Sequence, residues 1–335
     1  MRLTVLCCSL LILISGSATA QQAPFSEWLA ALRAEAEGQG VSAATLDTAL
    51  AGIEPDPEVI RLDRHQPEFT QTFQRYIELR VSETRVRRGL EQKAAHWPAL
   101  ERVGQAYGVQ PRFILAIWGL ETNYGSFTGG KGVVRSLATL AYDERRSAYF
   151  RRELLNALKI LDEGHIDAAA MKGSWAGAMG QSQFMPSSFL DYAEDFDGDG
   201  RRDIWLTEID VFASIANYLS RYGWRNDMTW GRPVMLPVAY DNFAPQLMPA
   251  EEPKSCRRAL KSHTDRFPLA RWQELGIRRL NGDDLPTRDF SASMVRPAGA
   301  GGPAFLTYAN YRTILRYNCS NYYAISVGML ANRLR

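Results

Sequence analysis

Apolar residues recur at intervals of three and four positions from Phe25 to about Gly223, with few β-branched runs, which predicts a series of amphipathic helices. One predicted helix begins at Phe25, and another extends over 69–86. A third follows Pro111, because proline suits the first turn of a helix, and Gly125 suits its end. The first two thirds of the chain are therefore predicted to be mainly helical.

The pattern changes beyond Trp230, where prolines become frequent and short apolar runs replace the helical spacing. Such runs, bounded by turn residues, predict short strands. The helical spacing returns from Tyr311 to Leu334, so the C-terminal helix is expected to pack on the earlier helices. We predict a mainly α (α+β) fold with a small β-rich insertion at 228–308. The predicted strands contain Val234 to Leu236, Val238 to Tyr240, Gly276 to Leu280 and Ala304 to Tyr308.

The N-terminus has the pattern of a cleaved secretory signal. Arg2 precedes an apolar run from Leu3 to Ile14, and small residues follow up to Ala20. The run of about 12 residues is shorter than the roughly 20 that a membrane-spanning helix needs, and no later segment is long and uncharged enough to span a bilayer. An uncleaved anchor is the alternative interpretation. We expect residues 1–20 to be removed and the protein to be exported, periplasmic and soluble.

The composition is that of an ordinary globular protein. The chain has 335 residues, 46% of them hydrophobic, and a formal net charge of only +2. Arginine clusters at 80–88 and 145–152 are typical of solvated helix faces, with binding to an acidic polymer as the alternative. Because the chain lacks a general basic footprint, no nucleic-acid partner is expected.

The cysteines change the picture once the signal is considered. Its removal takes Cys7 and Cys8 away and leaves Cys256 and Cys319 in an oxidising compartment. These two residues form either one disulfide, which would stabilise the fold by about 4 kcal/mol, or two buried thiols.

Glu121 lies near the end of the helix that begins at Pro111, on the edge of a stripe formed by Phe113, Ile117 and Leu120. A lone glutamate near a helix end is usually solvated. A carboxyl held against apolar neighbours instead has its charged form disfavoured, so its pKa rises and it can donate a proton near neutral pH. Glu121 is therefore a candidate general acid.

Residues 173–188, which we call the central block, read GSWAGAMGQSQFMPSS. They combine small residues that let a ligand approach the backbone, amides and hydroxyls for polar contacts, apolar walls and a proline that starts a helix. A structural loop would share the glycines, but it would rarely also need Ser174, Gln181 and Gln183 among so many apolar neighbours. The block is therefore a candidate ligand-binding segment.

Three segments resemble the lytic murein transglycosylase B family: ETNYG at 121–125, the central block, and RYNCSNYYA at 316–324, which we call the terminal motif. The likeness extends from about Phe25 to Leu334. It implies a lysozyme-like helical core with an additional α domain and a small inserted β domain. The expected divisions are an α domain at 21–88 with part of 130–170, the core at 89–227, the insertion at 228–308 and a C-terminal helix at 309–335 that returns to the core.

The resemblance also implies an enzyme that acts on peptidoglycan. The family cleaves the β-1,4 bond between N-acetylmuramic acid and N-acetylglucosamine without water and forms 1,6-anhydromuramoyl products. By matching motifs, the catalytic acid falls on Glu121, and no catalytic cofactor is expected. The sugar-binding positions fall on Ser174, Gln183, Tyr149, Tyr218, Tyr317, Asn318 and Tyr323.

The number of carboxylates in these motifs agrees with that chemistry. Glycoside hydrolases ordinarily need two, whereas these motifs offer one. Glu121 can protonate the leaving oxygen and then remove the proton from the 6-hydroxyl of the same sugar, whose attack is favoured because it is intramolecular. Tyrosines supply flat apolar area and a hydroxyl for sugars, with plain core packing as the alternative for each of them.

The segment from Asp195 to Leu206 follows the calcium-loop pattern, with acids at positions 1, 3, 5 and 9 and glycine at position 6. Position 12, ordinarily a bidentate glutamate, is Leu206. The resemblance suggests an EF-hand-like loop at 195–210 closed by a later acid, Asp210 or its rival Glu208; an acidic turn without metal is the alternative. We predict a structural Ca²⁺ site of weak affinity, about 10⁻⁴–10⁻³ M. Its predicted ligands are Asp195, Asp197, Asp199, Arg201 and Asp210.

Two other functions are compatible with these motifs, namely a non-catalytic peptidoglycan-binding scaffold and a hydrolytic muramidase. The intact Glu121 segment argues against the scaffold, and the lack of a second motif carboxylate argues against the hydrolase. Peptidoglycan strands are the expected substrate, the protein is expected to be a monomer, and cell-wall synthesis or division proteins are candidate partners.

Overall fold

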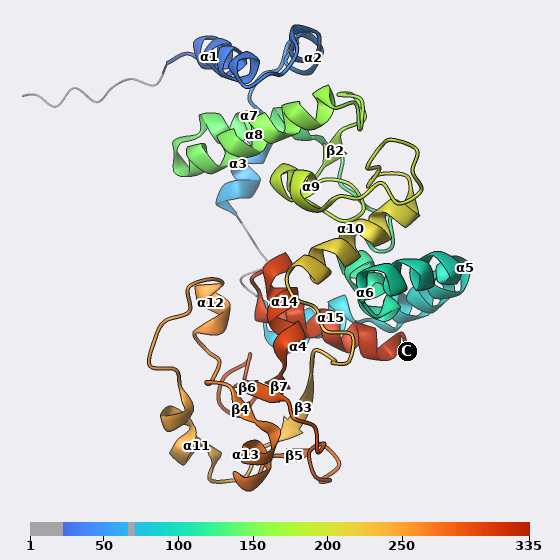
Figure 1. The fold of residues 1–335 in the computed structure, drawn as a ribbon. Helices are drawn as coiled ribbons and strands as arrows, with labels where there is room; N and C mark the ends of the chain where they lie inside the picture. The colour runs from blue at the N-terminus through green and yellow to red at the C-terminus, as the bar shows by residue number, and fades with distance from the viewer. Residues whose placement is uncertain (1–22, 66–70) are drawn as a thin grey trace, which may run out of the picture.

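The computed structural model describes residues 23–65 and 71–335, so the predicted signal peptide at 1–20 lies outside the described residues. In Figure 1 the molecule has an upper group of helices, a central group of helices and a lower β-rich region. Within the described ranges, no helix combines the length and apolar character needed to cross a bilayer.

The upper group combines N-terminal helices with helices from the middle of the chain (Figure 1). Its elements are α1 (Phe25–Gly38), α2 (Ala43–Ala49), α3 (Pro57–Arg64), α7 (Val133–Tyr142), the 3₁₀ turn η2 (Glu144–Arg146) and α8 (Ser147–Asp162). The Ser42 side chain caps α2, and its hydroxyl donates to the Asp162 carboxylate at 2.5 Å. Asp63 of α3 forms ion pairs with Arg145 and Arg146. Polar contacts of long sequence separation therefore join the two segments.

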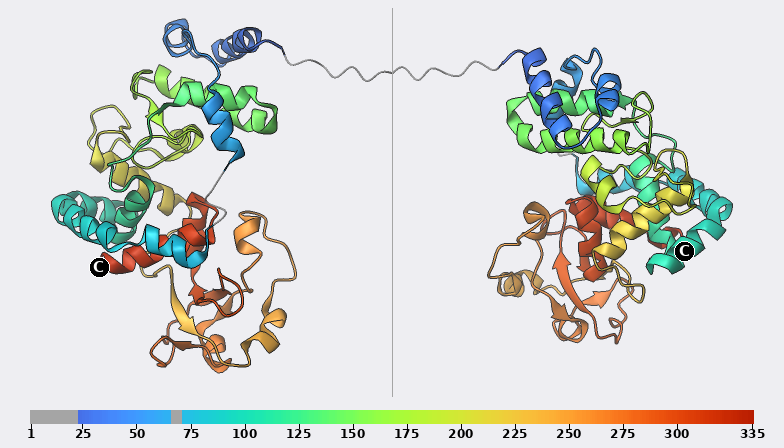
Figure 2. Two further views of the ribbon diagram at one scale, coloured as in Figure 1. Left: turned by 180° about the vertical axis from the view of Figure 1, so that it is seen from behind. Right: turned by 45° about the horizontal axis from the view of Figure 1, so that its top comes forward.

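The central group surrounds α6, whose side chains are apolar on nearly every face. Its helices are α4 (Phe73–Arg80), α5 (Glu83–Tyr107), α6 (Pro111–Thr122), α10 (Glu208–Arg221), α14 (Ala309–Tyr317) and α15 (Asn321–Arg333). The short helix α9 (Pro186–Tyr192) packs on α8 of the upper group and on α10. Every residue from Phe113 to Leu120 is buried, because α5, α10 and α15 pack around this helix. The C-terminal helix α15 therefore completes the core around α6, and Figure 2 shows it beside α4 as well.

The lower region contains a five-stranded antiparallel sheet in the order β4-β6-β7-β3-β5. Its elements are β3 (Gly231–Met235), α11 (Tyr240–Phe243), η3 (Ala244–Leu247), α12 (Arg257–Leu260), β4 (Phe267–Pro268), α13 (Leu269–Glu274), β5 (Arg278–Arg279), β6 (Ser291–Val295) and β7 (Ala304–Thr307). A separate apolar cluster, with Trp272, Met294 and Leu306 at its centre, joins α13 to the sheet. The predicted mainly α fold with a small β-rich insertion is confirmed.

Three local predictions differ from the structure. Val238 to Tyr240 is not a strand, because Tyr240 begins α11. The helix predicted over 69–86 is two helices where the structure describes it, since the Ser82 side chain caps a new helix, α5. The C-terminal helix is likewise divided into α14 and α15. The expected boundary between the α domain and the core, at residue 88, falls inside α5. This helix packs on α6 and α10 rather than on the upper group.

Two further links join segments that are far apart in the sequence. The structure joins Cys256, which precedes α12, to Cys319, which lies between α14 and α15, so the predicted disulfide is present and the alternative of two thiols is wrong. A small antiparallel ladder pairs β1 (Lys131–Gly132) with β2 (Lys172–Gly173), at the start of the central block. The disulfide holds the β-rich region against the terminal motif.

Candidate active site

Glu121 lies in the last turn of α6, which ends at Asn123 in a left-handed backbone conformation (φ +50°). Its carboxyl is only partly exposed, and Oε1 accepts a hydrogen bond of 2.6 Å from the Tyr323 hydroxyl. Burial raises the pKa of Glu121 to about 7, although the hydrogen bond from Tyr323 and the positive charge of Arg80 both lower it. The carboxyl can therefore carry a proton near neutral pH.

Ser174 and Gln183 of the central block both bond to the backbone. Ser174 Oγ accepts a hydrogen bond of 3.0 Å from the N–H of Ala178, across the turn that begins the block. Gln183 has a left-handed backbone (φ +51°), and its Nε2 donates to the carbonyl of Thr128 at 3.0 Å. These contacts fix both side chains within the central block, and the Gln183 bond joins the block to the loop that follows α6.

Gln181 joins three parts of the site. Its Oε1 accepts from the indole N–H of Trp118 (2.8 Å), its Nε2 donates to the carbonyl of Trp205 (3.0 Å), and its backbone carbonyl accepts from the Thr122 hydroxyl (3.0 Å). Gly125 (φ +75°) passes so near this amide that a Cβ would collide with Oε1. The network fixes the end of α6 against the central block, so the amide of Gln181 serves the fold.

The predicted tyrosines of the terminal motif gather at Glu121. Tyr323 contacts the carboxyl directly, and the Tyr317 hydroxyl donates to the carbonyl of Ser182 at 2.6 Å. Burial raises the pKa of both tyrosines, and the negative charge of Glu121 acts in the same direction on each. The Tyr218 ring lies 4.8 Å from that of Tyr317. The structure therefore brings these tyrosines together from α10, α14 and α15.

Tyr149 is placed differently. It lies on α8 in the upper helical group, 38% exposed, where its ring meets that of Phe150 at 5.1 Å. Among the ring contacts and hydrogen bonds of the described residues, none joins Tyr149 to Tyr218, Tyr317 or Tyr323.

Asn318 lines a cavity of about 520 Å³, which we call the α12 pocket because Arg258 and Ala259 of α12 form part of its wall. Tyr76 of α4 and Trp175 of the central block line it as well.

The sequence reasoning missed several residues of this region. Trp175 and Tyr322 lie within the central block and the terminal motif, so their place in those motifs would have been enough to predict them. Arg80 belongs to a cluster assigned to a solvated helix face, yet its charge lowers the pKa of Glu121. Tyr76, on the same helix, acts on the pKa of Tyr323, and only the packing of α4 on α15 reveals this.

The comparisons with known proteins agree with this geometry. A family model described as the transglycosylase SLT domain matches residues 24–332. The chain belongs to this family. The membrane-bound lytic murein transglycosylase B of Escherichia coli (strain K12) is 35% identical over 236 residues, which are 69% of this chain and 59% of the relative. The match thus spans less than two thirds of that relative's length.

Solved structures of other transglycosylases are similar over nearly the whole chain. SltB3 from Pseudomonas aeruginosa in complex with NAG-anhNAM-pentapeptide has a TM-score of 0.85 and 46% identity, covering 92% of this chain and 79% of that chain. The Escherichia coli lytic transglycosylase SLT35 in complex with calcium has a TM-score of 0.74 and 29% identity, covering 93% and 92%. The predicted family and its lysozyme-like fold are confirmed.

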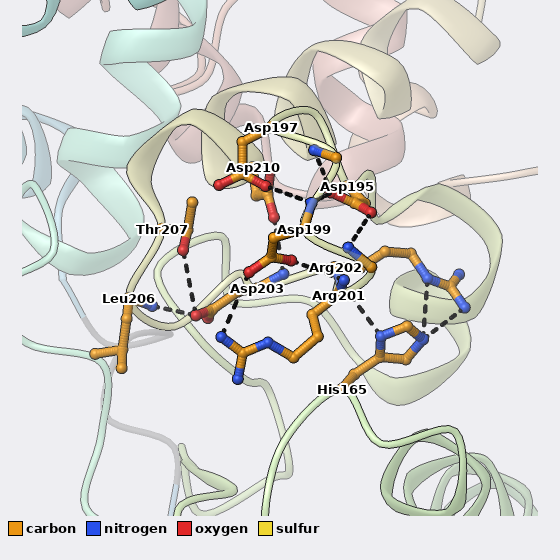
Figure 3. A network of polar contacts seen from close by, with 12 residues as sticks. His165, Asp195, Asp197, Asp199, Arg201, Arg202, Asp203, Leu206, Thr207 and Asp210 are labelled. Atoms are coloured by element: carbon orange, nitrogen blue, oxygen red, sulfur yellow. Dashed lines mark hydrogen bonds and ion pairs between the residues drawn. The ribbon is translucent and has the colours of Figure 1, made fainter.

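The acidic loop of this transglycosylase-family chain brings three carboxylates together. Ligand oxygens of Asp195, Asp197 and Asp210 lie within 4.8 Å of one another (Figure 3). Asp210 is buried at the start of α10, and its carboxylate accepts hydrogen bonds from the backbone N–H groups of Phe196 (2.8 Å) and Asp203 (3.0 Å). Burial is the main reason that the pKa of Asp210 is raised, because a buried carboxylate lacks solvation. A cation at this cluster would compensate the concentrated negative charge.

The other residues of the loop lie outside this carboxylate cluster. Asp199 and Arg201 lie at the exposed tip, where the Asp199 carboxylate accepts from the Arg201 N–H at 2.8 Å. Position 12 of the loop is Leu206, whose apolar side chain carries no ligand oxygen and is 79% exposed. Within the described residues, the cluster contains Asp210 and not the rival Glu208. The donor set therefore fits an oxygen-preferring cation such as Ca²⁺.

Proposed function

We propose that the protein is a peptidoglycan lytic transglycosylase, which cleaves the β-1,4 bond between N-acetylmuramic acid and N-acetylglucosamine and forms 1,6-anhydromuramoyl products. The observation that carries the proposal is the Glu121 carboxyl, whose pKa burial raises to about 7 while a tyrosine hydroxyl fixes one oxygen. Membership of the transglycosylase family supports the same chemistry. SltB3, a relative, binds NAG-anhNAM-pentapeptide.

Glu121 acts first as the acid. The Tyr323 hydroxyl bonds to Oε1, so Oε2 is the oxygen left to carry the proton to the glycosidic oxygen. As the bond breaks, positive charge develops at C1 of the muramoyl ring, and the N-acetyl group of that sugar stabilises it. The departing N-acetylglucosamine leaves as an alcohol, and Glu121 is now a carboxylate.

The carboxylate then acts as the base. It removes the proton from the 6-hydroxyl of the muramoyl sugar, O6 bonds to C1, and the acid is regenerated together with the anhydro ring. The positive charge of Arg80 lowers the pKa of Glu121, and the three family motifs contain no carboxylate besides Glu121. A hydrolytic route would ordinarily use a second carboxylate.

The remaining predicted residues hold the sugars. Tyr218 and Tyr317 offer ring faces, and Ser174 and Gln183 offer polar groups on the loop beside α6. Asn318 and Tyr149 are proposed to extend these contacts along the strand. The peptidoglycan strand is therefore held by aromatic and amide groups rather than by net charge.

Digestion of purified sacculi followed by mass analysis of the muropeptides tests this function. The proposal expects products lighter by one water than the hydrolytic ones, and Glu121→Gln abolishes them. Full-mass reducing ends would identify a muramidase instead. Binding to sacculi without any product would identify a scaffold.

We further propose a structural Ca²⁺ at the acidic loop, with carboxylate ligands from Asp195, Asp197 and Asp210, a contribution from Asp199 and the backbone carbonyl of Arg201. The clustering of three carboxylates supports it, and the relative SLT35 has been solved in complex with calcium. Such an ion would fix the loop that leads into α10, which carries Tyr218. It would take no part in the bond cleavage.

We also propose that the protein acts as a periplasmic monomer after export and removal of residues 1–20, near proteins of cell-wall synthesis or division. The support is the charge and hydrophobicity pattern of the N-terminus. N-terminal mass analysis of the exported form tests this, since an intact Met1 would indicate an uncleaved anchor.

A further inference from the structure

Phe127 is a large apolar side chain that the fold leaves uncovered. It lies at residues 123–130, which follow α6 and which we call the α6 loop, and it is 75% exposed. Tyr124 of the same loop is only 4% exposed, so the loop buries one aromatic ring and presents the other to solvent. A single exposed apolar residue is common on protein surfaces and indicates nothing by itself. The place of Phe127 in the molecule is what distinguishes it.

The α6 loop holds Phe127 close to the Glu121 carboxyl. The backbone N–H of Phe127 donates to the carbonyl of Thr122 at 3.0 Å, and Thr122 directly follows Glu121. The chain turns back on itself in this way because residues 123–125 successively adopt left-handed backbone conformations, with φ of +50°, +60° and +75°. The turn therefore returns the chain to the end of α6 and places an exposed aromatic residue there.

The α6 loop is fixed on both sides of its turn. The Tyr124 hydroxyl donates to the carbonyl of Arg85 at 3.1 Å, which anchors the loop on α5. The Ser126 hydroxyl donates to the carbonyl of Asn123 at 2.9 Å and accepts from the Asn123 amide at 3.1 Å. Because the backbone around Phe127 is already ordered, a ligand that covers the ring pays little conformational entropy.

The same loop packs on the two predicted sugar-binding residues of the central block. The carbonyl of Thr128, which follows Phe127, accepts the hydrogen bond of 3.0 Å from Gln183 Nε2. A Cβ on Gly129 would lie 2.8 Å from the backbone nitrogen of Ser174, so the two backbones are in direct contact. The ladder of β1 and β2 continues this contact along the chain. Phe127 therefore lies between a backbone contact to α6 and backbone contacts to the central block.

A sugar ring is the ligand that suits an exposed aromatic ring in this place. A pyranose carries its hydroxyl groups around its edge and presents C–H groups on its faces, and a flat aromatic side chain can cover such a face. The polar partners for the edge are nearby, since Ser174 and Gln183 adjoin the α6 loop. Phe127 lies outside the three family motifs, so the resemblance assigned no role to it.

We propose that Phe127 binds the peptidoglycan strand by stacking its ring on the face of a sugar near the cleaved bond. This inference rests on the proposed function and adds an aromatic contact to the polar groups of the central block. The contact is made equally in the bound substrate and in the transition state, because the stacked sugar face takes no part in the bond cleavage. Loss of the ring therefore weakens substrate binding and leaves the chemical step unchanged.

The test measures kcat and KM for soluble peptidoglycan strands. Phe127→Ala is expected to raise KM about tenfold and to keep kcat within about twofold of the wild-type value. Phe127→Tyr and Phe127→Trp keep a flat ring and should keep the wild-type KM, whereas Phe127→Leu is apolar but not flat and should resemble Phe127→Ala. Leu280→Ala is the matched control, because Leu280 is also exposed (60%) but follows β5 in the β-rich region, and its KM should not change.

Two kinetic results would overturn the proposal. A lower kcat at unchanged KM in Phe127→Ala would mean that the residue acts through the position of α6 and not through a sugar contact. A wild-type KM in Phe127→Leu would rule out stacking.

A binding measurement separates this inference from the proposed function. The dissociation constant for soluble strands is compared between Glu121→Gln and the double variant that also carries Phe127→Ala, and the second change should weaken binding about tenfold. That loss, together with no anhydro products from the wild type, would support the sugar contact and contradict the transglycosylase activity. Anhydro products from the wild type together with equal binding by the two variants would contradict only the sugar contact.

Discussion

The hydrogen bond from Tyr323 to Glu121 influences the pH at which the proposed catalytic acid carries its proton. Replacement of Tyr323 by Phe removes only the hydroxyl, which donates to Oε1 of Glu121 at 2.6 Å. The ring remains in its buried place on α15, so packing around the carboxyl is preserved. The hydroxyl stabilises the charged carboxylate, so its removal must raise the pKa of Glu121 further.

The size of the shift follows from the strength of the bond. A hydrogen bond to a charged group contributes about 1.5–3 kcal/mol, and one to a neutral group about 0.5–1.5 kcal/mol. The midpoints of these ranges differ by roughly 1.25 kcal/mol, which corresponds to about one pKa unit. The pKa of Glu121, about 7 in the native protein, is therefore expected to move to about 8 in Tyr323→Phe.

The assay is the pH dependence of kcat/KM on soluble peptidoglycan strands. Because the acid must be protonated to cleave, activity falls above the pKa of Glu121, and the descending limb should move up by about one pH unit in Tyr323→Phe. Tyr317→Phe is the matched control, since the Tyr317 hydroxyl donates to the carbonyl of Ser182 instead, and its limb should stay in place. A limb that stays fixed or moves to lower pH in Tyr323→Phe would refute the reasoning.

Three further perturbations test other parts of the molecule. Glu121→Gln removes a carboxyl whose pKa is about 7 in the folded protein and 4.5 ordinarily, so between these pH values the carboxyl is ionised only in the unfolded chain. As pH rises from 4 to 8, the unfolding free energy of the wild type should therefore fall by about 3 kcal/mol relative to that of the variant. Denaturant curves that show the same pH dependence for both proteins would contradict this. Ca²⁺ should raise the melting temperature of the wild type, and a chelator should lower it. Asp195→Asn should abolish this response, whereas the control Glu208→Gln should keep it. A wild-type melting temperature that responds to neither agent would refute the metal site. Cys256→Ser should cost about 4 kcal/mol of unfolding free energy, because the disulfide closes a loop with a sequence separation of 63, and an unchanged denaturation midpoint would argue against that contribution.

Local sequence determined the elements whose causes are local. Pro111 starts α6 and the left-handed Asn123 ends it within a few residues of the predicted limit, because capping and periodicity act over one or two turns. Periodicity was misleading at Ser82, because the Ser82 side chain caps a new helix and so divides a segment that periodicity alone predicts to be one helix. The position of Glu121 on an apolar edge likewise predicted its raised pKa, because burial against apolar neighbours disfavours the charged carboxylate.

Contacts between distant parts of the chain could be decided only by the tertiary structure. Tyr323 lies 202 residues from Glu121, and no local pattern specifies which hydroxyl will reach which carboxyl oxygen. Arg80 looks like part of a solvated face until α4 packs on α15 and brings its charge near the site. The choice of Asp210 over Glu208 depends on which side chain the first turn of α10 directs toward the loop. The sequence by itself determined the chemical groups, the helices that carry them and the family motifs. The distances between those groups were determined by the packing of helices from both ends of the chain, because they depend on the whole core rather than on neighbouring residues.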